Sequence, residues 1–160
     1  MNRISGAILI VLLAGFDQLS KYLVEQYLPF HQSEPFIPFL SFYRTYNEGI
    51  AFSMLRFIDN QILSVLIIVV ILFVLWMWYQ TKPDRLYSQL GYIFILAGAI
   101  GNLIDRITLG YVIDFIQFHT QSWSFAIFNL ADSFVTVGAM LIILDELIQI
   151  INSKQRATDE

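Results

Sequence analysis

Two aspartates stand near the end of the chain in surroundings that are costly for a carboxylate. Asp114 and Asp132 lie on either side of a short aromatic segment, and the neighbours of both are mostly apolar or aromatic. Keeping an ionised carboxylate away from water costs free energy, so a residue in such a place usually has a task. When two carboxyl groups lie close together, they share a proton. The pair can then act as general acid and general base, which is the chemistry that activates water toward an amide carbonyl.

The composition of the chain describes a protein with little water-facing surface. Of its 160 residues 57% are hydrophobic and 14% are charged, whereas a soluble domain carries roughly 25% charged residues. The net charge of −4 comes without a basic run, so nothing points to nucleic acid as a partner. The chain has no cysteine and two widely separated histidines, a pattern that predicts no metal site. We expect no metal and no organic cofactor.

Four apolar segments are long enough to cross a membrane as helices. The clearest is residues 62–79, which contain no charge and end in an aromatic belt before a charged loop. The N-terminal segment begins like a signal peptide, but no cleavage site follows, and it continues as helix to Pro29. The predicted fold is an all-α polytopic membrane protein, one domain over residues 1–160 with a disordered tail at 152–160. The transmembrane helices are expected at residues 4–27, 60–79, 86–106 and 127–150.

The Lys and Arg residues outside the spans predict the orientation. Five of them fall on the side of the two termini and four on the other side. Cytoplasmic loops carry the excess, so both termini are expected in the cytoplasm. Residues 28–59 and 107–124 then lie on the outer side. The first of these segments partly alternates large and polar side chains, which predicts a small β-structure at about residues 35–57, lying on the membrane surface.

Four polar clusters converge at this outer level. On the last helix the polar residues lie three, four and seven positions apart and share one face: Asn129, Asp132, Ser133 and Thr136. The third helix repeats the spacing with Gly98, Gly101, Asn102 and Asp105. Asp17 and Lys21 are four residues apart, which suits an ion pair, and NEGIAF at 47–52 forms the fourth cluster. Asp114 falls at the same level, so five stretches of the chain point to one site.

Each cluster also has a purely structural interpretation. Asp17 with Lys21 fits an ion pair at a helix end, and Asn102 fits an interhelical hydrogen bond. His31 and His119 fit ordinary interfacial residues. For the two buried aspartates the alternatives are a proton or cation relay in a transporter and a non-catalytic scaffold or chaperone. Four helices without an inverted repeat fit a transporter poorly unless the protein oligomerises, and a scaffold would not need the polar clusters to converge.

Five short motifs occur along the chain in a fixed order. They are DQLSK at 17–21, NEGIAF at 47–52, GAIGNLIDR at 98–106, GYVIDF at 110–115 and FNLADS at 128–133. Together they resemble the lipoprotein signal peptidase family, signal peptidase II. The resemblance implies an aspartic endopeptidase of the bacterial inner membrane whose site lies near the periplasmic face. Such an enzyme cleaves prolipoproteins just before a cysteine that carries a diacylglyceryl group.

The same resemblance implies roles for individual residues. Asp114 and Asp132 match the catalytic dyad of the family, and Asp17, Lys21 and Asp105 match positions with supporting roles. The residues that the resemblance assigns to substrate binding are Asn47, Gly49, Asn102, Arg106, Asn129 and Ala131.

The resemblance also implies partners and one moving part. The expected partners are the diacylglyceryl-modified prolipoprotein, membrane lipid and the cyclic peptide inhibitor globomycin, and the expected state is a monomer. A mobile outer element that closes over the site is expected near residues 53–60. One departure from the family pattern is Ile50, which stands before Ala51 where two alanines often follow the glycine. The change keeps the position apolar.

Overall fold

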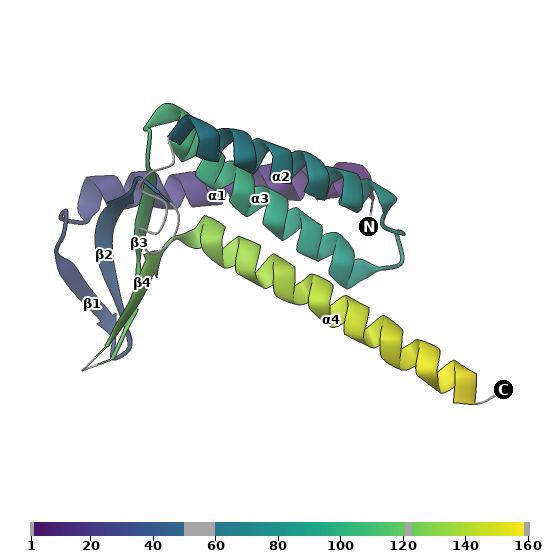
Figure 1. Ribbon diagram of the computed structural model, residues 1–160. Helices are drawn as coiled ribbons and strands as arrows, with labels where there is room; N and C mark the ends of the chain where they lie inside the picture. Colours follow the sequence, from purple (N-terminus) through teal and green to yellow (C-terminus); the bar gives the residue numbers. More distant parts are fainter. Residues whose placement is uncertain (1, 50–59, 121–122, 159–160) are drawn as a thin grey trace.

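The structure is a computed structural model of the chain, and it describes residues 2–49, 60–120 and 123–158. These residues form long helices and two pairs of short strands (Figure 1). The helices are α1 (Arg3–Tyr27), α2 (Asn60–Gln80), α3 (Leu86–Thr108) and α4 (Leu130–Thr158), and the strands are β1 (Ser33–Ile37), β2 (Leu40–Asn47), β3 (Val112–His119) and β4 (Ser124–Phe128). Each helix is long and apolar enough to cross a membrane, so the predicted fold class is confirmed.

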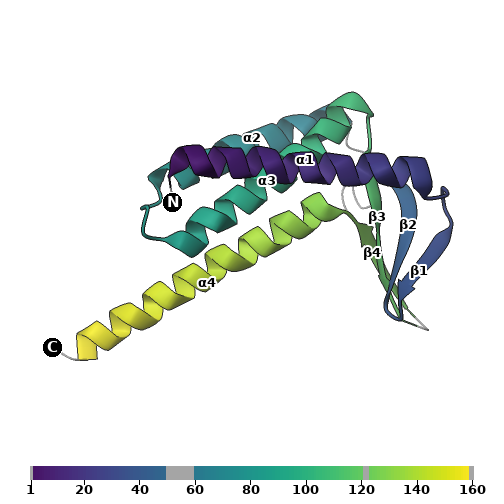
Figure 2. The same ribbon diagram turned by 180° about the vertical axis from the view of Figure 1, so that it is seen from behind.

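Helix α3 is the centre of the bundle. The helices α1, α2 and α4 each pack against it, and α3 is the most buried of the four spans. Both chain termini lie at one end of the bundle, and the sheet lies at the other end (Figures 1 and 2). We call these the terminal end and the sheet end. Helices α1 and α3 run toward the sheet end, and α2 and α4 run away from it.

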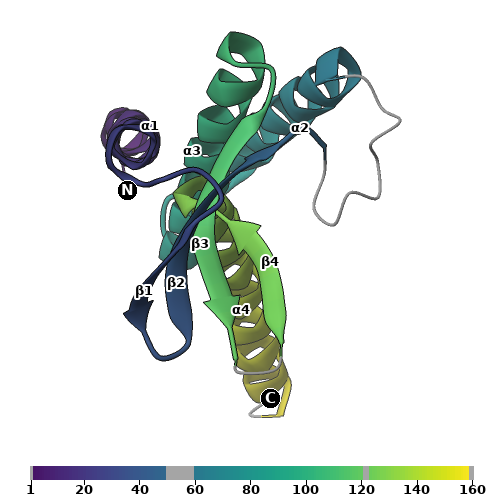
Figure 3. The same ribbon diagram turned by 90° about the vertical axis from the view of Figure 1, so that its left-hand side faces the viewer.

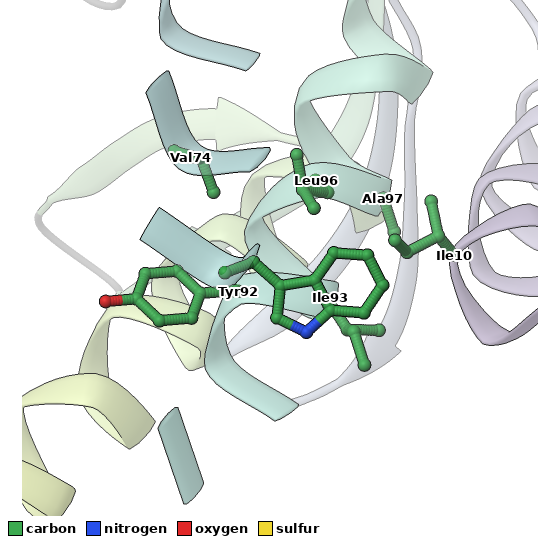
Figure 4. Close-up of a cluster of buried hydrophobic side chains, with 7 residues drawn as sticks. Ile10, Val74, Tyr92, Ile93, Leu96 and Ala97 are labelled. Atoms are coloured by element: carbon green, nitrogen blue, oxygen red, sulfur yellow. The ribbon is translucent and has the colours of Figure 1, made fainter. Parts of the chain in front are cut away.

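The apolar core lies where α1 and α2 meet α3 (Figure 4). Helix α3 contributes four side chains from one face: Tyr92, Ile93, Leu96 and Ala97. Ile10 of α1 and Val74 and Trp78 of α2 pack against them. The indole nitrogen of Trp78 donates to Gln89 at 2.7 Å, which satisfies the one polar atom of this side chain. Many other apolar side chains of α1, α2 and α4 stay exposed on the outside of the bundle, as expected for surfaces in contact with lipid.

Small residues bring α3 and α4 close together. A Cβ atom on Gly98 would collide with the carbonyl oxygen of Ala131, and a Cβ atom on Gly138 would lie 2.6 Å from the carbonyl oxygen of Gly91. The two contacts are seven residues apart on each helix, so one face of α3 meets one face of the antiparallel α4. Lipid offers no hydrophobic drive for helix association, so close backbone packing of this kind carries much of the contact.

The strands form one antiparallel sheet in the order β1-β2-β3-β4 (Figure 3). Strands β1 and β2 precede α2, whereas β3 and β4 follow α3, so the sheet joins two segments that are distant in the sequence. Strand β2 pairs with β3 so that Thr45 lies opposite Asp114 and Asn47 opposite Val112. This pairing brings the end of β2 to the residue that the sequence marks as half of a dyad.

The structure differs from the sequence prediction in two places. The sequence predicts β-structure in the first outer segment only, whereas half of the sheet comes from residues 112–128. The predicted disordered tail at 152–160 is helical as far as Thr158, because Lys, Gln, Arg and Ala in this segment are good helix formers. Residues 50–57 of the expected β-structure lie outside the described residues, as do Ile50 and Ala51 and nearly all of the expected mobile element.

Replacing Gly98 by Ala tests the close contact between α3 and α4. The added methyl group meets backbone, which cannot rotate away, so we expect Gly98→Ala to lower the stability by about 1–3 kcal/mol. The measurement is the thermal unfolding midpoint of the purified protein in detergent. Gly15→Ala is the matched control, because a Cβ atom there meets nothing within 4 Å. That change should be neutral or slightly stabilising. Equal midpoints for the two variants would contradict the packing argument.

Candidate active site

Asp114 and Asp132 come from different elements and meet at one residue. Asp114 lies on β3, and Asp132 lies in the first turn of α4. The side-chain amide of Asn129 donates to Asp114 Oδ1 at 2.7 Å. The backbone N–H of the same residue donates to Asp132 Oδ2 at 3.2 Å. The structure therefore brings together the two aspartates that the sequence singles out.

The start of α4 explains why Asp132 points toward Asn129. The Oδ1 atom of Asn129 accepts from the backbone N–H of Asp132 at 3.0 Å, and the Asp132 carboxylate accepts from the backbone N–H of Asn129. This reciprocal pair is a capping box, in which the first helical residues satisfy each other's free donors. It also places the Asp132 carboxylate at the positive end of the helix dipole, where negative charge is stabilised.

Asp114 is held in a more buried place. Its side chain is 3% exposed, and its second oxygen accepts from the Asn47 amide at 3.0 Å. Burial raises the pKa of Asp114 to about 7, and the negative charge of Asp132 adds to the increase, whereas the two amide donors oppose it. A carboxyl group with this pKa can both hold and release a proton near neutral pH.

A buried ammonium group lies behind the two aspartates. Lys21 is 2% exposed, and its Nζ contacts Asp17 Oδ2 at 2.8 Å, Asp105 Oδ2 at 2.9 Å and Asn102 Oδ1 at 3.1 Å. An ammonium group has donors only, so the oxygen of the Asn102 amide must face it. The other end of that amide, Nδ2, donates to Asp132 Oδ1 at 2.8 Å. The side-chain amide of Asn129 also donates to Asn102 Oδ1, at 3.2 Å. Lys21 and Asn129 together therefore determine which end of the Asn102 amide meets Asp132.

The carboxylates that contact Lys21 also hold the backbone of the two segments that carry the dyad. Asp17 Oδ1 accepts from the N–H of Ala131 at 2.9 Å, next to Asp132. Asp105 Oδ2 accepts from the N–H of Ile113 at 3.2 Å, next to Asp114. One buried network thus fixes α4 and β3 against α1 and α3.

Arg106 forms a second link across the site. Its guanidinium donates to the carbonyl oxygen of Gly49 at 2.8 Å and to Asn60 Oδ1 at 3.3 Å. The side-chain oxygen of Asn47 accepts from the Gly49 N–H at 3.1 Å, so the segment after β2 is held from both sides. The Nε atom of Arg106 is buried and has no hydrogen-bond partner among the described residues.

A cavity of about 840 Å³ opens in front of the dyad. Asp114 and Asp132 line it together with Asn102 and Arg106. Its other walls are mainly apolar side chains of α2, α3 and α4, among them Leu66, Ile95 and Met140. An apolar groove that ends in a few polar groups suits a ligand with a long hydrophobic part and one polar reacting group.

The structure sorts the residues that the sequence selects into two groups. Asn47, Gly49, Asn102 and Arg106 line the cavity with the dyad. Asn129 and Ala131, expected to contact substrate, are instead 0% exposed and do not line it. They lie behind the dyad and position it. Ser133 and Thr136 also line the cavity.

Sequence reasoning missed two polar residues of the network. Gln18 donates to Asp105 Oδ1 at 2.7 Å and to the carbonyl oxygen of Gly101 at 3.1 Å. Asn60, at the start of α2, contacts Arg106 in both directions. The only signal for Gln18 is its place beside Asp17 in the chain. Asn60 has no comparable signal, because its partner is distant in the sequence.

Comparison with known proteins agrees with this geometry. The family model for signal peptidase (SPase) II matches residues 9–148, which is most of the chain. The chain belongs to the signal peptidase II family. Among its relatives, a lipoprotein signal peptidase of Sinorhizobium fredii is 56% identical over 142 residues, covering 89% of this chain and 84% of that protein. The lipoprotein signal peptidase of Brucella ovis is 46% identical over 144 residues, covering 90% of each chain.

A solved structure has the same fold as this member of the signal peptidase II family. It is described as a bacterial membrane enzyme determined by the in meso method at 2.3 Å resolution. The two chains superpose with a TM-score of 0.82 at 30% sequence identity, covering 92% of this chain and 90% of the other. The likeness extends over the helices and the sheet rather than over one part of the chain.

The raised pKa of Asp114 predicts how the stability depends on pH. Between the ordinary value of 3.8 and about 7 the folded protein binds this proton more tightly than the unfolded chain. The contribution of Asp114 to the free energy of unfolding therefore falls as the pH rises through this window and is constant above it. The full change is on the order of 4 kcal/mol. Asp114→Asn should remove this pH-dependent contribution.

The measurement is the thermal unfolding midpoint of both proteins from pH 4 to pH 8. The unfolding midpoint of the variant should rise relative to that of the wild type as the pH rises to about 7. Above this pH the difference between the two midpoints should stay constant. Asparagine also loses one hydrogen bond to the Asn47 or Asn129 amide, but that loss does not titrate and shifts the whole curve equally. A difference between the two proteins that does not change with pH would show that Asp114 is not protonated in the folded state.

Proposed function

We propose that the chain removes the signal peptide from prolipoproteins, with Asp114 and Asp132 as its catalytic pair. The cut is made before the diacylglyceryl-modified cysteine. Membership of the signal peptidase II family supports the reaction, since this family is composed of lipoprotein signal peptidases. The observation that carries the assignment of residues is the shared contact with Asn129, which holds both carboxyl groups at the rim of one apolar cavity.

The surroundings of the two aspartates favour different roles in the reaction. Asp114 is the more enclosed, and its pKa of about 7 favours it as the member that holds the proton at rest. Asp132 lies at the start of α4 and accepts hydrogen bonds from the Asn102 amide and the Asn129 N–H. This place suits a carboxylate. We therefore assign the general base to Asp132 and the general acid to Asp114.

The reaction then needs only one water molecule and the proton of the pair. Asp132 removes a proton from water as the water oxygen attacks the scissile carbonyl carbon, and Asp114 gives its proton to the carbonyl oxygen. The resulting diol collapses when Asp132 passes its proton to the amide nitrogen and the C–N bond breaks. Asp114 takes back a proton from the diol. The products are the carboxyl end of the signal peptide and the free amino group of the cysteine.

The cavity walls and Arg106 fit the two ends of such a substrate. The apolar sides formed by α2, α3 and α4 suit a hydrophobic signal helix or acyl chains. Arg106 lines the cavity, and its guanidinium can donate to a carbonyl oxygen of the substrate or of its lipid. Asn102 also lines the cavity and is the second polar side chain that we propose to contact such a carbonyl oxygen. It does so while its amide donates to Asp132. Asn47 and Gly49, which hold each other at the rim, complete the proposed substrate contacts.

The place of the enzyme in the cell follows from the same proposal. The chain sits in the bacterial inner membrane with both termini in the cytoplasm and the sheet end at the periplasmic face. Placement of Lys82, Arg85 and Arg3 at the terminal end supports this orientation. We further propose that the protein acts as a monomer in contact with membrane lipid and that globomycin blocks the pair of aspartates.

Asparagine at either position tests the catalytic pair. Asp114→Asn and Asp132→Asn keep the size of the side chain and remove its proton, so each should slow cleavage of a diacylglyceryl-modified prolipoprotein by roughly 100-fold to 10,000-fold. Binding of globomycin and the unfolding midpoint verify that each variant is folded. Asp84→Asn is the matched control, because it makes the same change at an exposed carboxyl group between α2 and α3, outside the cavity. A folded Asp variant that still cuts near the wild-type rate would remove that aspartate from the mechanism.

Lys21 should affect the rate through Asn102. With Lys21→Met the Asn102 amide keeps the Asn129 donor but loses the ammonium group that also orients its oxygen. Weakening of the Asn102 bond to Asp132 by about 1–1.5 kcal/mol should lower kcat per folded enzyme about tenfold. The value of KM should change little, since Lys21 does not line the cavity. The measurement is kcat and KM, with the amount of folded protein determined from its elution peak and circular dichroism.

A double-mutant cycle separates this route from a direct effect of the charge. In an Asn102→Ala background there is no amide to orient, so a further fall in kcat on adding Lys21→Met is the part that acts through Asp17 and Asp105 and the backbone they hold. We expect this fall to be smaller than the fall that Lys21→Met causes in the wild-type background. If the two changes instead multiply, Lys21 acts on the reaction without Asn102. If kcat per folded enzyme is unchanged in Lys21→Met alone, the residue supports only the fold.

A further inference from the structure

A second cavity, of about 560 Å³, lies at the terminal end of the bundle. Trp76 and Gln80 near the end of α2 line it, together with the turn that joins α2 to α3. Glu146 and Gln149 of α4 form the wall on the other side. We call it the terminal cavity, and we call the cavity beside Asp114 and Asp132 the dyad cavity.

The two cavities lie along the same faces of the same three helices. Helices α2 and α4 each pack against α3 rather than against each other, and Figure 1 shows α3 between them. Residues seven positions apart on a helix lie on nearly the same face. Such steps lead on each helix from one lining to the other: Val70 to Met77 on α2, Ala99 to Tyr92 on α3, and Asp132 in two steps to Glu146 on α4.

The distance between the cavities matches the length of a signal peptide. Glu146 follows Asp132 by 14 residues and Gln149 follows it by 17, which is about 21–25 Å along α4. A helical peptide of the same length has roughly 14–17 residues. A signal peptide places an apolar segment of about 7–15 residues between its basic N-terminal region and its cleavage site. With the scissile bond at the dyad, the basic region therefore reaches the terminal cavity.

The charges at the terminal cavity favour a cation. Glu146 pairs with Arg85 at 2.7 Å and its side chain still remains 55% exposed. The buried Asp145 pairs with the same guanidinium at 2.6 Å, so two carboxyl groups oppose one cation. The turn adds Lys82 and Asp84, whose opposite charges offset each other. Among the described residues that form these pairs and this lining, one negative charge remains in excess.

The α2 side of the cavity is suited to a long basic side chain. Trp76 lines the cavity and is 58% exposed. An indole ring attracts a cation to its face, and it also packs against the apolar stem of Lys or Arg. Helix α2 ends at Gln80, so the cavity lies at the negative end of the helix dipole, where cations are stabilised.

The N-terminus of the protein itself shows such a contact at the same helix end. Arg3 begins the apolar helix α1, and its guanidinium donates to the carbonyl oxygens of Tyr79 at 3.0 Å and Thr81 at 2.8 Å. It also lies over the ring of Trp78, 5.1 Å from the ring centre. Thr81 lines the terminal cavity as well. The end of α2 therefore already holds a basic residue that precedes an apolar helix.

We propose that the terminal cavity binds the basic N-terminal region of the signal peptide while the scissile bond lies at the dyad. This inference rests on the proposed function. Glu146 pairs with a Lys or Arg side chain of the signal peptide, and Trp76 packs against the stem of that side chain. The apolar segment of the peptide lies along the strip between the two cavities. Because this contact is distant from the reacting atoms, it acts on KM and leaves kcat unchanged.

Two substrates that differ only in their N-terminal charge test the proposal. Both are diacylglyceryl-modified prolipoproteins with an acetylated N-terminus, and the N-terminal region of one carries two lysines where the other has two glutamines. Cleavage is measured in micelles of an uncharged detergent. We expect the wild type to have a KM about threefold to fivefold lower for the lysine substrate, with equal kcat. Glu146→Gln should raise the KM for the lysine substrate to that of the glutamine substrate.

Two further variants accompany this test. Glu34→Gln makes the same change at an exposed residue of β1, at the sheet end, and should keep the preference for the lysine substrate. Gln149→Glu adds a carboxyl group to the wall of the terminal cavity without removing the Glu146 pair with Arg85. It should increase the preference, and it carries the test if Glu146→Gln does not fold. The unfolding midpoint shows which variants are folded.

Three results would overturn the proposal. Equal KM values of the wild type for the two substrates would show that the cavity does not bind the basic region, whereas cleavage of both would leave the proposed function intact. An equal rise in KM for both substrates in Glu146→Gln would mean that the cavity binds another group, such as a lipid headgroup. If the wild type cuts neither substrate, the proposed function itself fails and this subsite fails with it.

Discussion

The ammonium group of Lys21 is the constraint on which the sheet end of this protein depends. A cation removed from water carries a large desolvation cost, which is offset only if all of its donors find acceptors. Lys21 meets three: Asp17, Asp105 and Asn102. These acceptors belong to α1 and α3 and in turn bind the backbone or side chains of α4 and β3. Neutralising one charge therefore places both segments that carry Asp114 and Asp132, the proposed catalytic pair.

This network can exist only because the helices approach closely. Asp17 reaches the backbone of α4 past Gly101, where a Cβ atom would lie 2.5 Å from its carboxylate oxygen. The contact between Gly98 and Ala131 brings the start of α4 to the same depth. Packing between small residues thus has a chemical consequence here. It allows a carboxylate on one helix to hold the first turn of another, and Asp132 lies in that turn.

The sequence predicts the parts of this arrangement that depend on local patterns. The spans follow from hydropathy, and the helical spacing of Asn129 with Asp132 and of Asn102 with Asp105 correctly places polar groups on shared faces. Spacing along one helix does not show which faces of two helices meet, so it does not predict the contact of Lys21 with Asp105. The pairing of β2 with β3 joins residues about 70 positions apart, as Thr45 opposite Asp114 shows, and no local pattern specifies such a register. For the same reason the burial of Asn129 and Ala131 behind the dyad appears only in the structure.

The balance of charge in the network favours a bound proton on Asp114. The described part of the network holds four carboxyl groups, Asp17, Asp105, Asp114 and Asp132, but only two cations, Lys21 and Arg106. Asp17 and Asp105 both contact the ammonium directly. Among the residues that the structure describes, Asp114 accepts only from the neutral amides of Asn47 and Asn129, and burial raises its pKa to about 7. A buried site with fewer cations than carboxyl groups lowers its free energy by binding a proton, and the proton goes where no cation competes for the oxygen. In the proposed reaction, this excess of carboxyl groups over cations supplies the proton donor.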